Sequence, residues 1–272
     1  MAFVSDFLLG LQLSLRARFV SIFFILIITL CVATLLAAQF SARQPQTVAL
    51  DVGISVIRFS LPLFVILMVQ ELFTREFERK LHLRSFTYPR ARLYWLLGRV
   101  SAILLLAGSL LVGMGLILAA MAVLAAGSYE QTTPVGLGFP YLVTLSFVAV
   151  DLLVVVAIAT LLAISAATPS FVLIGTIGFV LIARSYTPIM DLLHNSPYVV
   201  NQFADPGLYK DSLGLLAFLM PDLGRLDVRM IALYDQMRFL PSDWPLLVGA
   251  TLIYVVSLLA LTSWVLNKRE FN

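Results

Sequence analysis

Charged residues are scarce in this sequence. Of its 272 residues only 12% are charged, whereas 61% are hydrophobic. An average soluble domain carries about 25% charged residues. A soluble fold of this length would need more polar surface than the chain can supply. We therefore predict an all-α integral membrane protein, built as a single domain over residues 1–272.

Cysteine, lysine and histidine are also rare, and each shortage excludes a class of chemistry. The single Cys31 lies inside an apolar run, which excludes a disulfide framework and a cysteine-based metal cluster. None of the three lysines follows a glycine, so the chain lacks a phosphate-binding loop and cannot hydrolyse ATP by that route. His82 and His194 fall on opposite sides of the membrane in the topology below. We therefore predict no catalytic residue, no metal site and no cofactor held by this chain.

A basic face on a folded domain, which nucleic-acid binding would require, is missing too.

Apolar runs, in contrast, are abundant, and a spanning helix needs about 20 mostly apolar residues. We predict six spans, at residues 19–38, 54–73, 93–126, 141–166, 171–183 and 244–266.

The basic residues are distributed unevenly along the flanks of these spans. Short loops rich in Lys and Arg stay on the cytoplasmic side of a membrane. Alternate flanks hold Arg16 and Arg18, then the stretch 73–99, then Lys268 and Arg269, whereas the other short loops offer only Arg43. We predict a bacterial plasma (inner) membrane protein with both termini in the cytoplasm.

Two further segments are not predicted to span. Residues 1–18 combine apolar residues at helical spacing with Asp6 and two arginines, which favours an amphipathic helix in the inner interface. The alternative is a simple extension of the first span. Residues 185–243 mix turn formers with amphipathic blocks, so we expect an outer segment of short interfacial or re-entrant helices before the last span.

Two ionisable residues fall within predicted spans, where a charge is costly unless it is paired or hydrated. Arg58 lies one turn from the outer end of the second span, and Asp151 about ten residues into the fourth. At 1.5 Å rise per residue their backbones differ in depth by roughly 9 Å, within reach of an Arg side chain. They form a candidate embedded pair. The alternative is that Arg58 extends to the outer surface and Asp151 serves as a structural hydrogen-bond acceptor.

The stretch 73–99 holds seven of the eighteen Lys and Arg residues. Glu71, Arg75 and Glu78 follow helical spacings of three and four, Phe77 lies among the apolar residues between them, and Pro89 ends the pattern. This predicts a short amphipathic helix at 74–90 between the second and third spans. An orientation signal in contact with anionic lipid is the simpler interpretation, but it would not require interleaved glutamates.

Residues 70–99, "QELFTREFERKLHLRSFTYPRARLYWLLGR", resemble the corresponding segment of ABC-2 type permeases, the type V ABC exporter fold. There an acidic-basic run and leucines precede a Pro-x-(Ser/Ala)-Arg-x-x-(Tyr/Leu)-x-x-Gly-(Lys/Arg) motif. The matching positions are Gln70, Glu71, Arg75, Glu76, Leu81, Pro89, Arg92, Gly98 and Arg99, with Tyr94 one position before the Tyr/Leu site of the motif. The layout of the whole chain agrees with this family, including the amino-terminal helix and the long outer segment.

The resemblance implies half of a transport machine. Two permease copies would form a homodimer on a separate ATP-binding subunit that carries ATP and Mg²⁺, with 74–90 as the coupling helix seated in that subunit. The turn at 167–170 would be a second, minor contact. The residues implied in the main contact are Arg75, Glu76, Phe77, Glu78, Arg79, Lys80, Leu81, Arg84, Pro89 and Arg92.

Two other classes of function remain open. One is a membrane assembly factor that uses the same ATPase to act on a periplasmic protein through residues 185–243. The other is a small secondary carrier driven by an ion gradient. A carrier is expected to show internal repeats and more embedded ionisable residues, and the sequence shows no repeat.

Overall fold

The computed structural model describes residues 2–15, 19–41, 43–74, 92–126, 135–166, 168–195 and 220–268. Within these ranges all regular structure is helical. Six helices are long and apolar enough to cross a membrane. The chain is therefore a multi-pass helical membrane protein whose solvent is a lipid bilayer, as the composition predicts.

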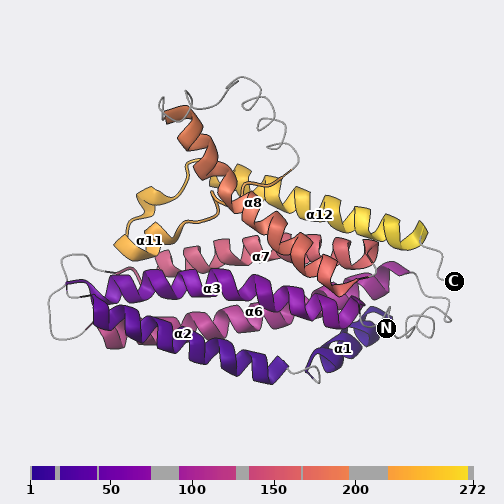
Figure 1. The fold of residues 1–272 in the computed structure, drawn as a ribbon, viewed down its shortest axis with the longest axis horizontal. Coiled ribbons are helices and arrows are strands. Elements are labelled where there is room, and N and C mark those ends of the chain that lie inside the picture. Colours follow the sequence, from indigo (N-terminus) through magenta and orange to yellow (C-terminus); the bar gives the residue numbers. More distant parts are fainter. Residues whose placement is uncertain are drawn as a thin grey trace.

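Figure 1 shows the arrangement of the helices. The six long helices are α2 (Val20–Phe40), α3 (Pro45–Val69), α6 (Arg92–Ala125), α7 (Phe139–Ser165), α8 (Pro169–Asn195) and α12 (Trp244–Lys268). The shorter elements are α1 (Ala2–Ser14), the π-helix η2 (Gln70–Thr74) that continues α3, α11 (Arg229–Tyr234) and the 3-10 turn η3 (Met237–Phe239). α1, η2, the start of α6, the start of α8 and the end of α12 gather at one end of the bundle (Figure 1).

Proline marks the start of four of the six long helices. Pro45, Pro140, Pro169 and Pro245 lie in the first turn of α3, α7, α8 and α12. A first-turn amide has no partner within the helix, so proline loses nothing there and its fixed φ favours the helical conformation. These positions therefore set where the chain re-enters the bundle.

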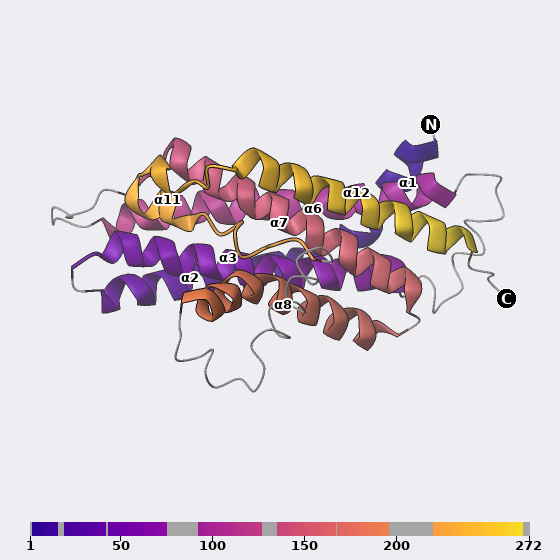
Figure 2. The same cartoon turned by 90° about the horizontal axis from the view of Figure 1, so that it is seen from above.

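α3 and α7 form the centre of the bundle, and α7 passes between α12 and α8 in the view from above (Figure 2). Most residues in the apolar stretch of each of these two helices are buried, whereas at most 22% are buried in the apolar stretches of α2, α8 and α12. The exposed side chains are large and apolar, for example Ile28 on α2 and Ile253 on α12. Because such surface is unfavourable in water, it is the surface that faces lipid.

Four buried threonine hydroxyl groups are satisfied within their own helices. Thr34, Thr160, Thr251 and Thr262 each donate to the carbonyl four residues earlier, at 2.6–2.8 Å. In lipid an unsatisfied polar group costs several kcal/mol (about 2–7). These bonds let polar residues lie in the core without a partner from another helix.

Two helices extend well beyond the predicted spans. α3 begins at Pro45, nine residues before the predicted start at 54. Its first turns contain polar residues, but Thr47, Ala49 and Leu50 there are buried in the bundle. α8 continues to Asn195, well past the predicted end at 183, and carries Pro188 inside the helix. Residues 185–195 of the predicted outer segment are therefore a continuation of α8. An added Cβ at Gly224 would lie 3.0 Å from the Arg184 carbonyl, which Pro188 leaves without its usual amide.

The described part of the outer segment, residues 220–243, packs back against the long helices. α11 contacts α7 and α3, and its Ile231 and Ala232 are fully buried. Arg225 ties the segment to the start of α12 through hydrogen bonds of 2.6 and 2.8 Å to the Asp243 carboxylate. These bonds lower the pKa of Asp243 and raise the pKa of Arg225.

α1 lies against the first turns of α6. A Cβ added at Gly98 of α6 would lie 3.1 Å from the Phe7 amide nitrogen, and one at Gly10 of α1 would lie 3.2 Å from the Ala102 Cβ. Glycine at both positions permits this close approach. Whether α1 lies in the membrane interface stays a prediction.

Candidate functional site

A chain of six charged side chains crosses the bundle between α3, α7, α8 and the segment before α11. Its members are Asp51 and Arg58 on α3, Asp151 on α7, Arg184 on α8, and Asp227 and Arg229 from residues 220–229, which we call the returning segment and which ends at the first residue of α11. We call this set the charge network. It brings together residues that are up to 178 positions apart in the sequence.

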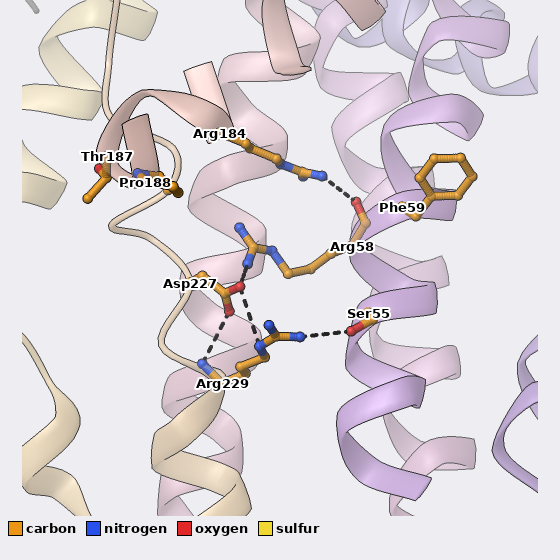
Figure 3. A pocket seen from close by; sticks show the side chains of 9 residues that line it. Ser55, Arg58, Phe59, Arg184, Thr187, Pro188, Asp227 and Arg229 are labelled. Atoms are coloured by element: carbon orange, nitrogen blue, oxygen red, sulfur yellow. Dashed lines mark hydrogen bonds and ion pairs between the residues drawn. The ribbon is translucent and has the colours of Figure 1, made fainter. Parts of the chain in front are cut away.

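The buried end of the charge network is centred on Asp151. Its Oδ2 atom accepts a hydrogen bond from Arg184 Nη2 and lies 4.0 Å from Arg58 Nη2. Arg184 Nη1 also donates to the Arg58 carbonyl oxygen, at 3.1 Å, so the two arginines are held side by side (Figure 3). Only 2% of the Asp151 side chain is exposed. This carboxylate thus joins α7, α8 and α3.

The other end of the network leads toward the surface. Arg58 Nη1 pairs with Asp227, whose Oδ2 also lies 3.5 Å from Arg229 Nε. Arg229 Nη1 in turn donates to Asp51 Oδ1 and to Ser55 Oγ, both at 3.0 Å. The Asp51 side chain is 44% exposed. The network therefore runs without interruption from a buried carboxylate to an accessible one.

Three arginines and three aspartates make the charge network formally neutral. A single unpaired charge at the centre of a spanning helix costs at least about 2.5–3.5 kcal/mol. Alternating partners remove most of that cost, whereas losing one partner leaves its neighbour uncompensated. Charges of this kind in a membrane protein mark a functional site more often than a purely structural one.

A pocket of about 510 Å³ opens beside the charge network, between α3, α8 and the returning segment. Its wall includes Ser55, Arg58, Arg184, Asp227 and Arg229, with Phe59, Thr187, Pro188 and Gly224 completing it (Figure 3). We call it the arginine pocket. Asp151 and Asp51, which balance two of these arginines, do not line it. The wall therefore presents three guanidinium groups and one carboxylate.

The structure brings the two residues of the sequence-predicted pair, Arg58 and Asp151, within 4.0 Å of each other, but it places a closer partner, Arg184, on Asp151. The predicted difference in depth counted Arg58 from position 54, whereas α3 begins at Pro45. Arg58 lies 13 residues into α3 and Asp151 lies 12 residues into α7, so at 1.5 Å rise per residue both are about 20 Å from the start of their helices.

Four members of the network were missed by sequence reasoning: Asp51, Arg184, Asp227 and Arg229. Arg184 carries a signal that the sequence offers. It lies 17 residues after position 167 and Asp151 lies 16 residues before it, so a tight turn there places the two at the same depth on neighbouring helices. Asp227 and Arg229 carry no such signal, since no spacing rule predicts how the segment before α11 returns.

The sequence-predicted contact for an ATP-binding subunit lies mostly outside the described residues. Of its ten residues, only Arg92 is described. The other nine lie in the range 75–91, outside the described residues: Arg75, Glu76, Phe77, Glu78, Arg79, Lys80, Leu81, Arg84 and Pro89. Arg92 Nη1 donates to the carbonyl oxygens of Leu266 and Asn267, at 2.9 and 3.2 Å. It thus holds the end of α12.

The described residues on either side of 75–91 are fixed to the bundle. Phe73, fully buried, packs edge-on against the Trp95 ring with centroids 5.4 Å apart. Gln70 Nε2 donates to the Pro169 carbonyl oxygen at 2.8 Å, which links η2 to the start of α8. Arg99, expected among the cytoplasmic flanking residues, is only 1% exposed. We call the set of contacts made by Gln70, Phe73, Arg92 and Trp95 the junction.

No protein-family model and no curated protein matches this chain. The geometry of the charge network, the arginine pocket and the junction therefore carries the functional argument, together with the sequence pattern around them.

Proposed function

We propose that this chain is the permease subunit of an ATP-driven ABC exporter in a bacterial plasma membrane, with both termini in the cytoplasm. Two copies would form the membrane part, and a separate subunit would bind ATP and Mg²⁺. The sequence of residues 70–99 suggests this class. The observation that carries the proposal is the junction, because it connects residues 75–91 to most of the bundle.

A coupling segment must pass force from a motor to the helices that move. The described residues that flank 75–91 on either side are joined by the Phe73–Trp95 contact. From there, Gln70 reaches the start of α8 and Arg92 reaches the end of α12. A displacement of 75–91 would therefore act on α3, α6, α8 and α12 together, as packed helices transmit strain. This supports a role of the segment in coupling rather than in orientation alone.

The contact with the motor rests on charge and shape. Arg75, Arg79, Lys80 and Arg84 would meet an acidic rim on the ATP-binding subunit, and Phe77 and Leu81 would fill an apolar groove. Closure of the ATP-binding subunits would then tilt α3 and α6 through the junction and open the path outward.

A secondary carrier is the second candidate, and one observation favours it. Carriers concentrate ionisable residues at membrane depth, and the charge network has six members rather than the two expected from the sequence. A carrier would need no ATPase. The two candidates therefore differ in what accompanies the chain and in what drives it.

The deciding experiment purifies the tagged full-length chain from its native membrane in a mild detergent. We expect an ATP-binding subunit to co-purify and the preparation to hydrolyse Mg-ATP. Substituting Phe77→Ala, or Glu76→Ala together with Glu78→Ala, should lower both the retained subunit and the hydrolysis. Arg43→Ala, in the turn between α2 and α3, serves as the matched control, because it removes a charge far from 75–91 in the sequence.

The proposal fails if no ATPase accompanies the chain, or if the Phe77 and Glu76/Glu78 variants keep both the subunit and the hydrolysis at wild-type levels. Transport that persists without ATP and collapses with the ion gradient would establish the carrier instead.

A further inference from the structure

The arginine pocket has an uneven distribution of charge. Its wall carries Arg58, Arg184 and Arg229 but only one carboxylate, Asp227. The remaining two aspartates of the charge network, Asp51 and Asp151, do not line the pocket. Asp227 is already shared between Arg58 and Arg229, so it is not available to hold a cation. The open face of the pocket therefore favours an anion.

The arginines also retain hydrogen-bonding capacity toward such an anion. A guanidinium carries five N–H donors in a planar fork that matches the oxygens of a phosphate. Arg184 makes one hydrogen bond through Nη1 and one through Nη2, and each of these nitrogens carries a second N–H that those two bonds do not use. Arg58 and Arg184 lie side by side, which places two forks on one wall.

An apolar edge adjoins this polar wall. Phe59 follows Arg58 on α3, lines the pocket and is 68% exposed, and Pro188 lines it from α8. Ile189, next to Pro188, is also exposed. Because the outward faces of α3 and α8 meet lipid, the pocket combines cationic donors with a side that hydrocarbon can reach.

We propose that the arginine pocket binds the phosphate group of an amphiphile, whose headgroup lies against Arg58, Arg184 and Arg229 while its hydrocarbon extends past Phe59 between α3 and α8. A volume of about 510 Å³ suits a headgroup, since ligand pockets span about 300–1,000 Å³. This binding goes beyond the proposed transport function, and it is measured on the full chain without an ATPase.

The test uses native mass spectrometry of the full-length chain in a neutral detergent. The probe is dioctanoyl phosphatidic acid, compared with dioctanoylglycerol, which has the same tails without phosphate, and with inorganic phosphate as competitor. We expect the phosphatidic acid to bind with one dominant site. Dioctanoylglycerol should show no such binding, and inorganic phosphate should compete only at far higher concentration.

Variants locate the site. Arg184→Gln with Asp151→Asn removes one wall cation together with its buried partner, so no unpaired charge remains. We expect affinity for the phosphatidic acid to fall about tenfold or more, as for the loss of a charge-assisted hydrogen bond. Arg225→Gln removes an exposed arginine that does not line the pocket and should leave affinity within about twofold. Arg184→Lys keeps the charge but loses the planar fork of the guanidinium, so we expect a severalfold loss of affinity for the phosphatidic acid. This variant serves as a second test if the double variant folds poorly.

Equal affinity in the wild type and both Arg184 variants would overturn the proposal. Equal binding of dioctanoylglycerol would overturn the role of phosphate. Competition by inorganic phosphate at the same concentration as the lipid would overturn the amphiphile, because the hydrocarbon would then contribute nothing. None of these outcomes depends on an ATP-binding subunit, so the binding site and the transport proposal fail separately.

Discussion

Substituting Asp151→Asn should destabilise the protein more than any other single neutralisation in the charge network. Asp151 is the most buried member of the charge network, and it contacts two arginines, Arg184 on α8 and Arg58 on α3. With asparagine there, Arg58 keeps Asp227, but Arg184 keeps only a carbonyl partner. The cost is therefore set by Arg184, a guanidinium left without a counter-charge.

The magnitude follows from burial. Breaking a buried ion pair by removing one partner costs about 3–5 kcal/mol. The Arg184 side chain is 23% exposed, so the lower end applies, about 3 kcal/mol. Arg58→Gln should cost less, about 1.5–2 kcal/mol, because Asp151 keeps Arg184 and Asp227 keeps Arg229. The double variant Asp151→Asn with Arg184→Gln should lose about 1 kcal/mol or less, since both charges leave together.

The assay is equilibrium unfolding in mixed micelles, in which sodium dodecyl sulfate is titrated against a neutral detergent and helical circular dichroism is followed. The expected order of destabilisation is Asp151→Asn, then Arg58→Gln, then the double variant Asp151→Asn with Arg184→Gln. If the double variant is no more stable than Asp151→Asn alone, the pairing argument is wrong. A smaller loss for Asp151→Asn than for Arg58→Gln would show that Asp151 does not hold the two arginines.

Two further predictions concern packing and pH. Gly53→Ala should lower the free energy of unfolding by about 1–3 kcal/mol, because the new Cβ would lie 2.1 Å from a Cδ atom of the fully buried Leu118. At Gly108 a new Cβ meets no atom within 4 Å, so Gly108→Ala should be neutral or slightly stabilising in the same unfolding assay. Equal losses at both glycines would contradict this. Hydrogen bonds from Arg225 lower the pKa of Asp243 in the folded protein. The stability that this ion pair contributes should therefore be fully present above about pH 4, the ordinary pKa of Asp. It should be lost as the pH falls through the lowered pKa of Asp243. Protease cleavage within 220–229 should rise over that acid range in the wild type but not in Asp243→Asn, and identical pH profiles would refute the assignment.

The number of spans could be predicted from the sequence because each is a long apolar run, and length and composition suffice for that. The ends of α3 and α8 could not. The polar residues Gln46, Thr47 and Asp51 make the first turns of α3 resemble a loop, and Pro188 resembles a helix terminator. In both places packing overrides local preference: Thr47, Ala49 and Leu50 are buried in the bundle, and α8 continues past Pro188 beside Gly224.

The charge network was predicted in part. Arg58 and Asp151 could be singled out because a charge within an apolar run is conspicuous. The same criterion missed Arg184, because the predicted span ended at 183, one residue before it. Asp227 lies in a polar stretch, where one more aspartate is unremarkable in composition. Its position beside Arg58 depends on how 220–229 folds back, and that is decided by long-range packing of α11 on α3 and α7.

The ion pair between Asp151 on α7 and Arg184 on the next helix, α8, also bears on how the chain enters the bilayer. Either residue alone near the middle of a helix adds about 2.5–3.5 kcal/mol to the free energy of membrane insertion. When α7 and α8 enter together as a hairpin, the two charges neutralise each other before either meets hydrocarbon. We therefore expect the fourth and fifth spans to insert together, because each charge then finds its partner within the same pair of helices.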